Sequence, residues 1–297
     1  MKRILWPWAA AAAVGFAALV IAGELALRAR YRHNALSPAP ATPATETVTI
    51  VALGDSIAFG APGLPEDAWP VLLEQRLQAV YPGVRWRIHN AGVPGDTAPK
   101  GYARFERDVA ATHPQMVLIA FGLNDCYPAR YGMDRWLEEA VPTGLRRSYV
   151  WRAVSVRATR AGWALGVTGQ PAPESTPTAA PRTSPLGFTD ALQALVDRVR
   201  MLDARPVLLT MTPLADSDAV GVVWRAATYE PYNAAIRRVA VRNSVPLVEL
   251  ATGAPPDALV PDGFHLTVAG QAWVAEQVFR QLEAAGAWRG LSEDGVP

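Results

Sequence analysis

Hydrophobic residues form short uninterrupted runs that alternate with segments of helical spacing, from about residue 48 to residue 284. The runs are rich in Val, Ile and Leu, which is typical of strands buried on both faces of a parallel sheet. We predict strands at Val48–Leu53, Val84–Asn90, Met116–Phe121, Pro206–Met211 and Val245–Leu250. We predict helices at Trp69–Val80, Tyr102–Ala111, Thr189–Leu202, Tyr232–Val241 and Val268–Ala284. The pattern therefore predicts an α/β fold in which helices cover both faces of a parallel sheet.

The N-terminal segment has a different pattern. Lys2 and Arg3 precede an apolar stretch from Ile4 to Gly23, and about 20 residues at ~1.5 Å each match the ~30 Å hydrocarbon core of a bilayer. The stretch continues into a Glu-Leu-Ala-Leu-Arg run without the small-residue cleavage site of a secretory signal. We therefore predict an uncleaved, single-pass transmembrane helix within residues 1–33, which would place the protein in the cell membrane. The alternative is a buried or amphipathic N-terminal helix.

The orientation of this anchor follows from its basic flanks. Lys2 and Arg3 favour a cytoplasmic N-terminus, whereas Arg28, Arg30 and Arg32 favour the opposite arrangement. We expect the catalytic domain to lie outside the cytoplasm.

Composition divides the rest of the chain. Residues 34–47 are rich in Pro, Ala and Thr and are predicted to be a tether. The folded domain is predicted over 48–285, with an insert at 127–188 and a tail at 286–297. The insert combines Trp and Arg residues with a Pro/Thr/Ala-rich part. It could be a cap packed on the domain, a wall that sets substrate specificity, or a membrane contact.

Charge and cysteine content exclude several classes of protein. The net charge of +1 gives no electrostatic basis for binding nucleic acid. Cys126 is the sole cysteine, so no intramolecular disulfide can form. The spacing of His, Cys, Asp and Glu matches no metal-ligand pattern, and no glycine-rich phosphate loop is present. We therefore predict no metal and no cofactor, and we take a monomer as the default.

The candidate chemistry lies where the predicted strands end. Gly54-Asp55-Ser56 follows the first predicted strand, and Gly122-Leu123-Asn124-Asp125 follows the third. Ligands of parallel α/β sheets bind beyond the carboxyl ends of the strands, so these loops should line one crevice. A serine hydroxyl needs a base and a group that orients this base, and Asp262-Gly263-Phe264-His265 supplies both residue types. Each motif alone is compatible with an ordinary turn, but the ordered set indicates acyl transfer.

These residues resemble a known family. Gly54-Asp55-Ser56, Asn90-Ala91-Gly92, Gly122-x-Asn124-Asp125 and Asp262-x-x-His265 are similar to the motifs of the SGNH hydrolases, also called the GDSL esterase/lipase family, in its membrane-anchored bacterial type. The resemblance implies a flavodoxin-like, three-layer α/β/α fold with a five-stranded parallel sheet of order 2-1-3-4-5.

The resemblance also implies roles for individual residues. Ser56, Asp262 and His265 would be the catalytic triad. The backbone N–H groups of Ser56 and Gly92 and the side-chain amide of Asn124 would form the oxyanion hole. We expect a serine esterase that cleaves a lipid, a small ester or an O-acylated glycan. The alternatives are an acyltransferase that uses the same triad and a non-catalytic binding domain that has kept the fold.

Overall fold

The computed structural model describes residues 18–23, 25–26, 46–61, 63–127, 180–214, 226–260, 263–288 and 291. The chain divides into two compact units, the first made of residues 1–36 and 131–168 and the second of residues 37–130 and 169–297. The described part of the first unit is helical, over 18–23 and 25–26. Every element discussed below belongs to the second unit.

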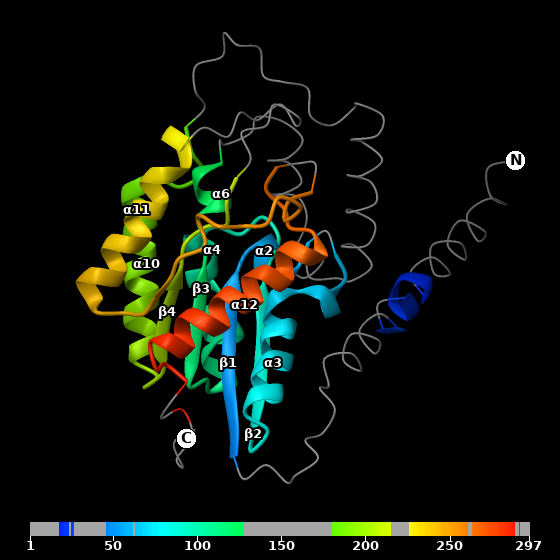
Figure 1. Cartoon of the computed structure of the whole chain (residues 1–297). Helices are drawn as coiled ribbons and strands as arrows, with labels where there is room; N and C mark the ends of the chain where they lie inside the picture. Colours follow the sequence, from blue (N-terminus) through cyan, green and yellow to red (C-terminus); the bar gives the residue numbers. More distant parts are fainter. Residues whose placement is uncertain are drawn as a thin grey trace, which may run out of the picture. The chain divides into compact units, whose positions relative to one another are not determined.

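A five-stranded parallel sheet forms the centre of the second unit (Figure 1). Its strands are β1 (Glu46–Gly54), β2 (Val84–Gly92), β3 (Met116–Ala120), β4 (Arg205–Leu209) and β5 (Leu247–Val248). The order β2-β1-β3-β4-β5 confirms the sequence-based prediction. Gly54 at the end of β1 pairs with Gly92 of β2 and with Ala120 of β3, so these three strands end at one level. The loops that follow them therefore share one edge of the sheet.

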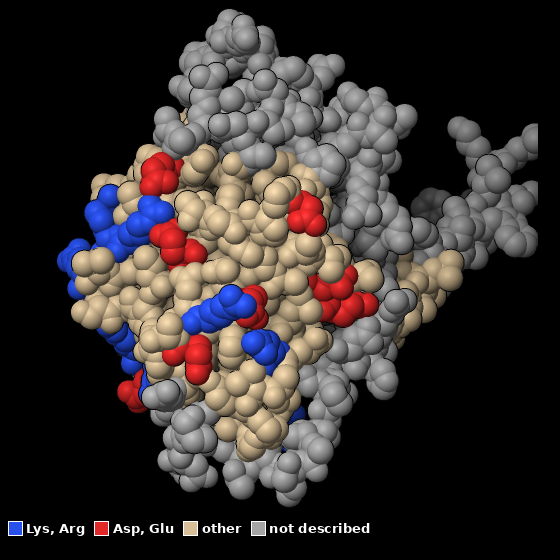
Figure 2. Space-filling view, viewed as in Figure 1, with Lys and Arg blue, Asp and Glu red and all other residues tan. Residues whose placement is uncertain are grey.

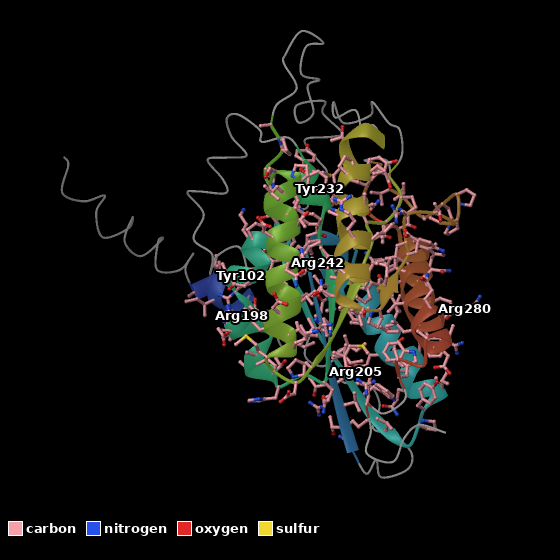
Figure 3. The ribbon with its side chains drawn as sticks, turned by 90° about the vertical axis from the view of Figure 1, so that its left-hand side faces the viewer. Tyr102, Arg198, Arg205, Tyr232, Arg242 and Arg280 are labelled. Atoms are coloured by element: carbon pink, nitrogen blue, oxygen red, sulfur yellow. The ribbon has the colours of Figure 1, made fainter. Side chains whose placement is uncertain are left out.

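Helices cover both faces of the sheet. Among the described residues of the second unit, the α-helices longer than four residues are α3 (Trp69–Val80), α4 (Ala98–Ala103), α10 (Pro185–Arg200), α11 (Ala226–Asn243) and α12 (Val268–Ala284). In the side view of Figure 3, α4 and α10 lie on one side of the strands and α3 and α12 on the other. The inward faces are apolar, for example Leu73 and Leu77 of α3 and Leu195 and Val199 of α10. Burial of these faces against the sheet stabilises the fold, by roughly 1.5–3 kcal/mol for each large side chain.

One predicted helix is wrong in its extent. Residues Tyr102–Ala111 do not form one helix but are divided among α4, α5 (Phe105–Asp108) and the short 3-10 turn η2 (Ala110–Thr112). The break falls at Arg104, whose φ of −105° and ψ of 8° end α4. Arg104 is buried, and its guanidinium contacts groups on three other segments described below. These contacts, one of them with Gly54 50 positions away, override the local helical pattern.

Three predicted boundaries also differ from the structure. β1 begins at Glu46, inside the predicted tether 34–47. The core helix α10 begins at Pro185, inside the predicted insert 127–188. Within the predicted tail 286–297, Trp288 is fully buried and donates its indole N–H to the carbonyl of Phe279 at 3.2 Å. Burial of this large ring makes the start of the tail part of the core.

The remaining predictions on domain organisation lie outside the described residues. These are most of the anchor 1–33, residues 34–45 of the tether, and residues 128–179 of the insert. Within the described part of the chain, no helix has the length and apolar character needed to cross a membrane. The face shown in Figure 2 carries both acidic and basic side chains among the described residues.

Candidate functional site

Ser56 lies at the first position of the short helix α2 (Ser56–Phe59), directly after β1. Asp55 is the N-cap of this helix, and its Oδ1 atom accepts a hydrogen bond from the N–H of Ile57 at 2.9 Å. This cap satisfies one of the N–H groups that every helix leaves without an intrahelical partner. Ser56 is therefore presented on a short turn whose start is fixed by the preceding residue.

His265 reaches Ser56 from the opposite end of the sequence. Its Nε2 atom lies 3.0 Å from the Ser56 Oγ atom. The loop that carries it is closed by a hydrogen bond from the N–H of Val260 to the carbonyl of His265, at 2.9 Å. The helix α12 then starts at its N-cap Thr267, whose side chain accepts from the N–H of Gly270. The third predicted member of the triad, Asp262, lies outside the described residues.

Asn124, in the loop after β3, contacts Asp55, the residue before Ser56. It lies in the short helix α6 (Leu123–Cys126), and its Nδ2 atom donates to Oδ2 of Asp55 at 3.2 Å. Gly122, the N-cap of α6, has a φ of +134°, which side chains disfavour. The turn at Gly122 thus directs the chain so that Asn124 meets the residue beside Ser56.

Gly92 has a different environment from the one expected for an oxyanion donor. Its N–H donates to the side-chain Oδ1 of Asn90 at 2.9 Å. A Cβ atom added at Gly92 would lie 2.3 Å from the backbone nitrogen of Phe59. The missing side chain therefore makes room for the backbone of α2.

Two further side chains contact the segment that follows Ser56: Asn90, which belongs to one of the motifs named above, and Gln271, to which no role was assigned from the sequence. Asn90 of β2 donates to the carbonyl of Ala58 at 2.8 Å. Gln271 of α12 accepts from the N–H of Trp69 at 2.9 Å and its Nε2 atom lies 3.4 Å from the carbonyl of Ile57. In the sequence, Gln271 stands out only as a polar residue on the apolar face of a predicted helix. Its hydrogen-bond partners, Trp69 and Ile57, are more than 200 positions away in the chain.

Arg104 fixes the end of β1 in a similar way. Its guanidinium donates to the carbonyl of Gly54 at 2.9 Å, to Asp96 at 2.7 Å and to Asp108 at 2.9 Å. The Arg104 side chain is buried, and the two carboxylates compensate its charge, as a buried guanidinium requires. The local sequence gives no sign of this role, because Arg104 occupies one position of the helix predicted over Tyr102–Ala111.

Two buried carboxyl groups lie beneath the site. Burial raises the pKa of Asp55 to about 7, and the nearby charge of Asp125 adds to the increase. Burial also raises the pKa of Asp125 to about 6, against hydrogen bonds from Thr183 and the N–H of Ala98 that lower it. The cause is desolvation, which disfavours the charged form of a carboxyl group. Among the described residues, no cluster of His, Cys, Asp or Glu could hold a metal ion.

A cavity of about 30 Å³ lies beside Asp55 and Ile57, the neighbours of Ser56 in sequence. Its wall also includes Leu123, the neighbour of Asn124, together with Phe121, Met211 and Leu214. The lining is mainly apolar. Most of it comes from the carboxyl ends of β1, β3 and β4, and Trp69 of α3, Leu250 after β5 and Val274 of α12 complete it. A small apolar group next to the Ser56 and Asn124 loops could therefore be accommodated.

Comparison with known proteins gives a consistent family match. A model of the family described as "GDSL-like Lipase/Acylhydrolase family" matches residues 52–273. An acetylxylan esterase of Geobacillus stearothermophilus is 43% identical over 70 residues, which are 24% of this chain and 31% of the relative. The thioesterase 1/protease 1/lysophospholipase L1 of Escherichia coli K12 is 34% identical over 77 residues, which are 26% of this chain and 35% of the relative. The matched stretch thus spans about a third of the length of these curated relatives.

Solved structures share the fold at low sequence identity. A lipase/acylhydrolase from Enterococcus faecalis has a TM-score of 0.54 at 17% identity and covers 80% of this chain and 96% of its own. LAE5, an enzyme from the metagenome of Lake Arreo, has a TM-score of 0.52 at 22% identity and covers 82% of this chain and 97% of its own.

Proposed function

The chain belongs to the GDSL-like Lipase/Acylhydrolase family, and from that premise we propose that it is a serine esterase that cleaves carboxylic esters through an acyl-enzyme. One observation carries the proposal: the 3.0 Å separation between Ser56 Oγ and His265 Nε2. This is hydrogen-bond distance, and it lets the imidazole remove the proton of the hydroxyl as the oxygen attacks an acyl carbonyl.

The reaction divides into two displacements. Ser56 Oγ attacks the ester carbonyl and gives its proton to His265 Nε2. His265 then returns this proton to the leaving alcohol, and the acyl group remains on Ser56. In the second half, water attacks the acyl-enzyme with His265 again as the base, and the acid is released. Asp262 would accept from the Nδ1–H of His265 and hold the imidazole in the productive tautomer.

The oxyanion formed in each half needs fixed donors. The N–H of Ser56, at the first position of α2, and the side-chain amide of Asn124 are proposed for this role. Gly92 can contribute its N–H if the bond to Asn90 Oδ1 is released.

The wider role of the protein rests on the predicted anchor. We propose a single-pass membrane protein with an extracytoplasmic catalytic domain that acts on a lipid, a small ester or an O-acylated glycan. The apolar stretch Ile4–Gly23 supports the anchor. Relatives named acetylxylan esterase and lysophospholipase support the glycan and lipid alternatives, respectively.

Two linked measurements test the esterase proposal. The wild-type chain should turn over p-nitrophenyl acetate without an added acceptor alcohol and should be labelled covalently by a fluorophosphonate. Ser56→Ala should lose both properties while its melting temperature stays nearly unchanged. A folded wild-type chain that neither turns over the ester nor takes the label would instead indicate a binding domain. Turnover that requires an acceptor alcohol would indicate an acyltransferase.

The role of Asp262 is tested by Asp262→Asn. An amide at this position would favour the wrong imidazole tautomer, so kcat should fall by roughly 10⁴-fold, as in well-studied serine hydrolases. Substrate binding and folding should change little. Full activity of this variant would exclude Asp262 from the triad and leave the Ser56–His265 pair to be oriented by another group.

A further inference from the structure

The side chain of Arg104 joins the two loops that follow β1 and β2. Its Nη2 atom donates to the carbonyl of Gly54 at 2.9 Å, two residues before Ser56. Its Nε atom donates to Oδ2 of Asp96 at 2.7 Å, four residues after β2 ends at Gly92. Gly54 and Gly92 are paired in the sheet. One guanidinium therefore spans the point at which these neighbouring strands separate into their loops.

The carbonyl of Gly54 has two donors. The N–H of Val93 reaches it at 3.0 Å and continues the ladder between β1 and β2. Arg104 is the second donor, so both lone pairs of this oxygen are used. The carbonyl belongs to the planar peptide that leads into Asp55, the cap of the helix that bears Ser56. The orientation of this peptide therefore sets the position of Ser56 relative to the sheet.

Asp96 holds the loop after β2 in two ways. Its N–H donates to the carbonyl of Val93 at 3.1 Å, which closes a turn over residues 93–96. Its carboxylate is buried and accepts the bond from Arg104, and such a charge-assisted bond is stronger than a bond between neutral groups. Asp96 thus shapes the turn through its backbone and attaches the turn to the end of β1 through Arg104.

Arg104 is also held from the helical side. It ends α4, and this helix packs closely on the residue after β3, because a Cβ atom added at Gly101 would lie 2.3 Å from Cζ of Phe121. The Nη1 atom of Arg104 donates to Asp108 of α5 at 2.9 Å. Asp108 helps to compensate the charge of the buried guanidinium. Unlike Asp96, it does not belong to a loop at the carboxyl edge of the sheet.

We propose that Arg104 and Asp96 are positioning residues for the hydrolytic reaction. Together they tie the loop after β2 to the end of β1 and so keep the Ser56 hydroxyl at its 3.0 Å distance from His265 Nε2. The inference rests on the proposed esterase function. The pair acts on the geometry of attack and has no part in substrate binding. Its loss should therefore lower kcat and leave KM nearly constant.

Asp96→Ala and Asp108→Ala are a matched pair of variants. Each removes one carboxylate from the same buried guanidinium and leaves the other to compensate its charge, so both should fold with a lowered melting temperature. We expect kcat of Asp96→Ala for p-nitrophenyl acetate to fall about tenfold, equivalent to ~1.4 kcal/mol of barrier, with KM within twofold of wild type. Asp108→Ala should keep both kcat and KM within about twofold of wild type.

Arg104→Lys tests the guanidinium itself. Lysine keeps the positive charge, but an ammonium group lacks the planar fork of donors that reaches Gly54, Asp96 and Asp108 together. We expect kcat to fall at least about tenfold with KM within twofold of wild type. A folded Arg104→Lys variant with the kcat of wild type would contradict the proposal.

The outcomes separate this inference from the function on which it rests. A wild-type chain without ester turnover or fluorophosphonate labelling overturns the function. An active wild type with kcat of Asp96→Ala within twofold, or with Asp96→Ala and Asp108→Ala equally impaired, overturns the positioning role. Should Asp96→Ala fail to fold, Asp96→Asn decides the matter. That variant keeps the shape and removes the charge, so kcat should fall about threefold or more, and an unchanged kcat would contradict the proposal.

Discussion

Asn124 donates a hydrogen bond from Nδ2 to Oδ2 of Asp55 at 3.2 Å, and Asp55 is the residue that caps the helix bearing Ser56. A side-chain amide nitrogen carries two hydrogens, so this bond occupies one and leaves the other to point elsewhere. The position of the Asn124 amide and the position of the Ser56 hydroxyl thus depend on one buried carboxyl group. Displacement of Asp55 would disturb the nucleophile and the proposed oxyanion donor together.

Removal of the Asn124 amide should affect the rate far more than the fold. Loss of one oxyanion donor costs ~3–4 kcal/mol of barrier, so Asn124→Ala should reduce kcat about 100- to 1,000-fold. KM should change little, because the donor acts on charge that develops in the transition state. Steady-state kinetics on a short ester provide the measurement, with the melting temperature as the control for folding. A kcat within a factor of three of wild type would remove Asn124 from the oxyanion hole.

Gly92→Ala should destabilise the nucleophile helix. Its Cβ would lie 2.3 Å from the Phe59 nitrogen and 2.8 Å from the Ala58 carbonyl carbon, so the backbone of α2 must shift. We expect a loss of roughly 3 kcal/mol or more in the free energy of unfolding, together with loss of activity. Gly83→Ala is the matched control, because no heavy atom lies within 4 Å of the added Cβ. Equal urea midpoints for the two variants would show that the contact with Phe59 is unimportant.

The sheet could be predicted from sequence because its signal is local. The run Val48–Leu53 is almost entirely apolar and ends at Gly54, and the run Met116–Phe121 is entirely apolar and ends at Gly122. The strand order came from the family resemblance, and the structure confirms it. The strands at the far edge were predicted less well. β5 comprises Leu247–Val248 where Val245–Leu250 was expected, because the extent of an edge strand depends on pairing with its one neighbour.

The supports of the site could not be predicted, because their partners are distant in sequence. Arg104 contacts Gly54 across 50 positions, and Gln271 accepts from Trp69 across 202 positions. Local periodicity treats both residues as ordinary helix positions. Trp288 was assigned to a tail for the same reason, since its ring packs edge-on against Trp86 of β2, far away in the chain. The sequence thus indicates the reacting groups but not the residues that hold them in position.

The two buried carboxyl groups should make stability depend on pH. The pKa of Asp55 is raised from 3.8 to about 7 and that of Asp125 from 3.8 to about 6. Between pH ~4 and those values the folded state binds more protons than the unfolded state, so the free energy of unfolding falls as pH rises. Each group contributes a slope of up to ~1.4 kcal/mol per pH unit. The stabilisation that the two protonated carboxyl groups provide is fully present below pH ~4 and is lost by pH ~7.

Urea unfolding at pH 5, 6 and 7 checks this effect in wild type and Asp125→Asn. The variant has no carboxyl group at this position, so its stability should decrease less between pH 5 and pH 6 than that of wild type. Groups outside this cluster titrate alike in both proteins, so the difference between their changes in the free energy of unfolding reports the two buried carboxyl groups. Identical slopes in the two proteins would mean that burial does not perturb Asp125.

The cavity beside Asp55 and Ile57 predicts a preference for short acyl groups. The cavity is small and mainly apolar, so a short acyl chain can lie against its wall, whereas a long chain would have to extend beyond it. A panel of p-nitrophenyl esters from two to twelve carbons, run on the full chain, should show kcat/KM highest for the shortest acyl groups.

Met211→Ala removes part of the cavity wall and should move the optimum to longer acyl chains. Met201→Ala, at an exposed methionine after α10, should leave it in place. A wild-type optimum at eight or more carbons would mean that the acyl group binds elsewhere.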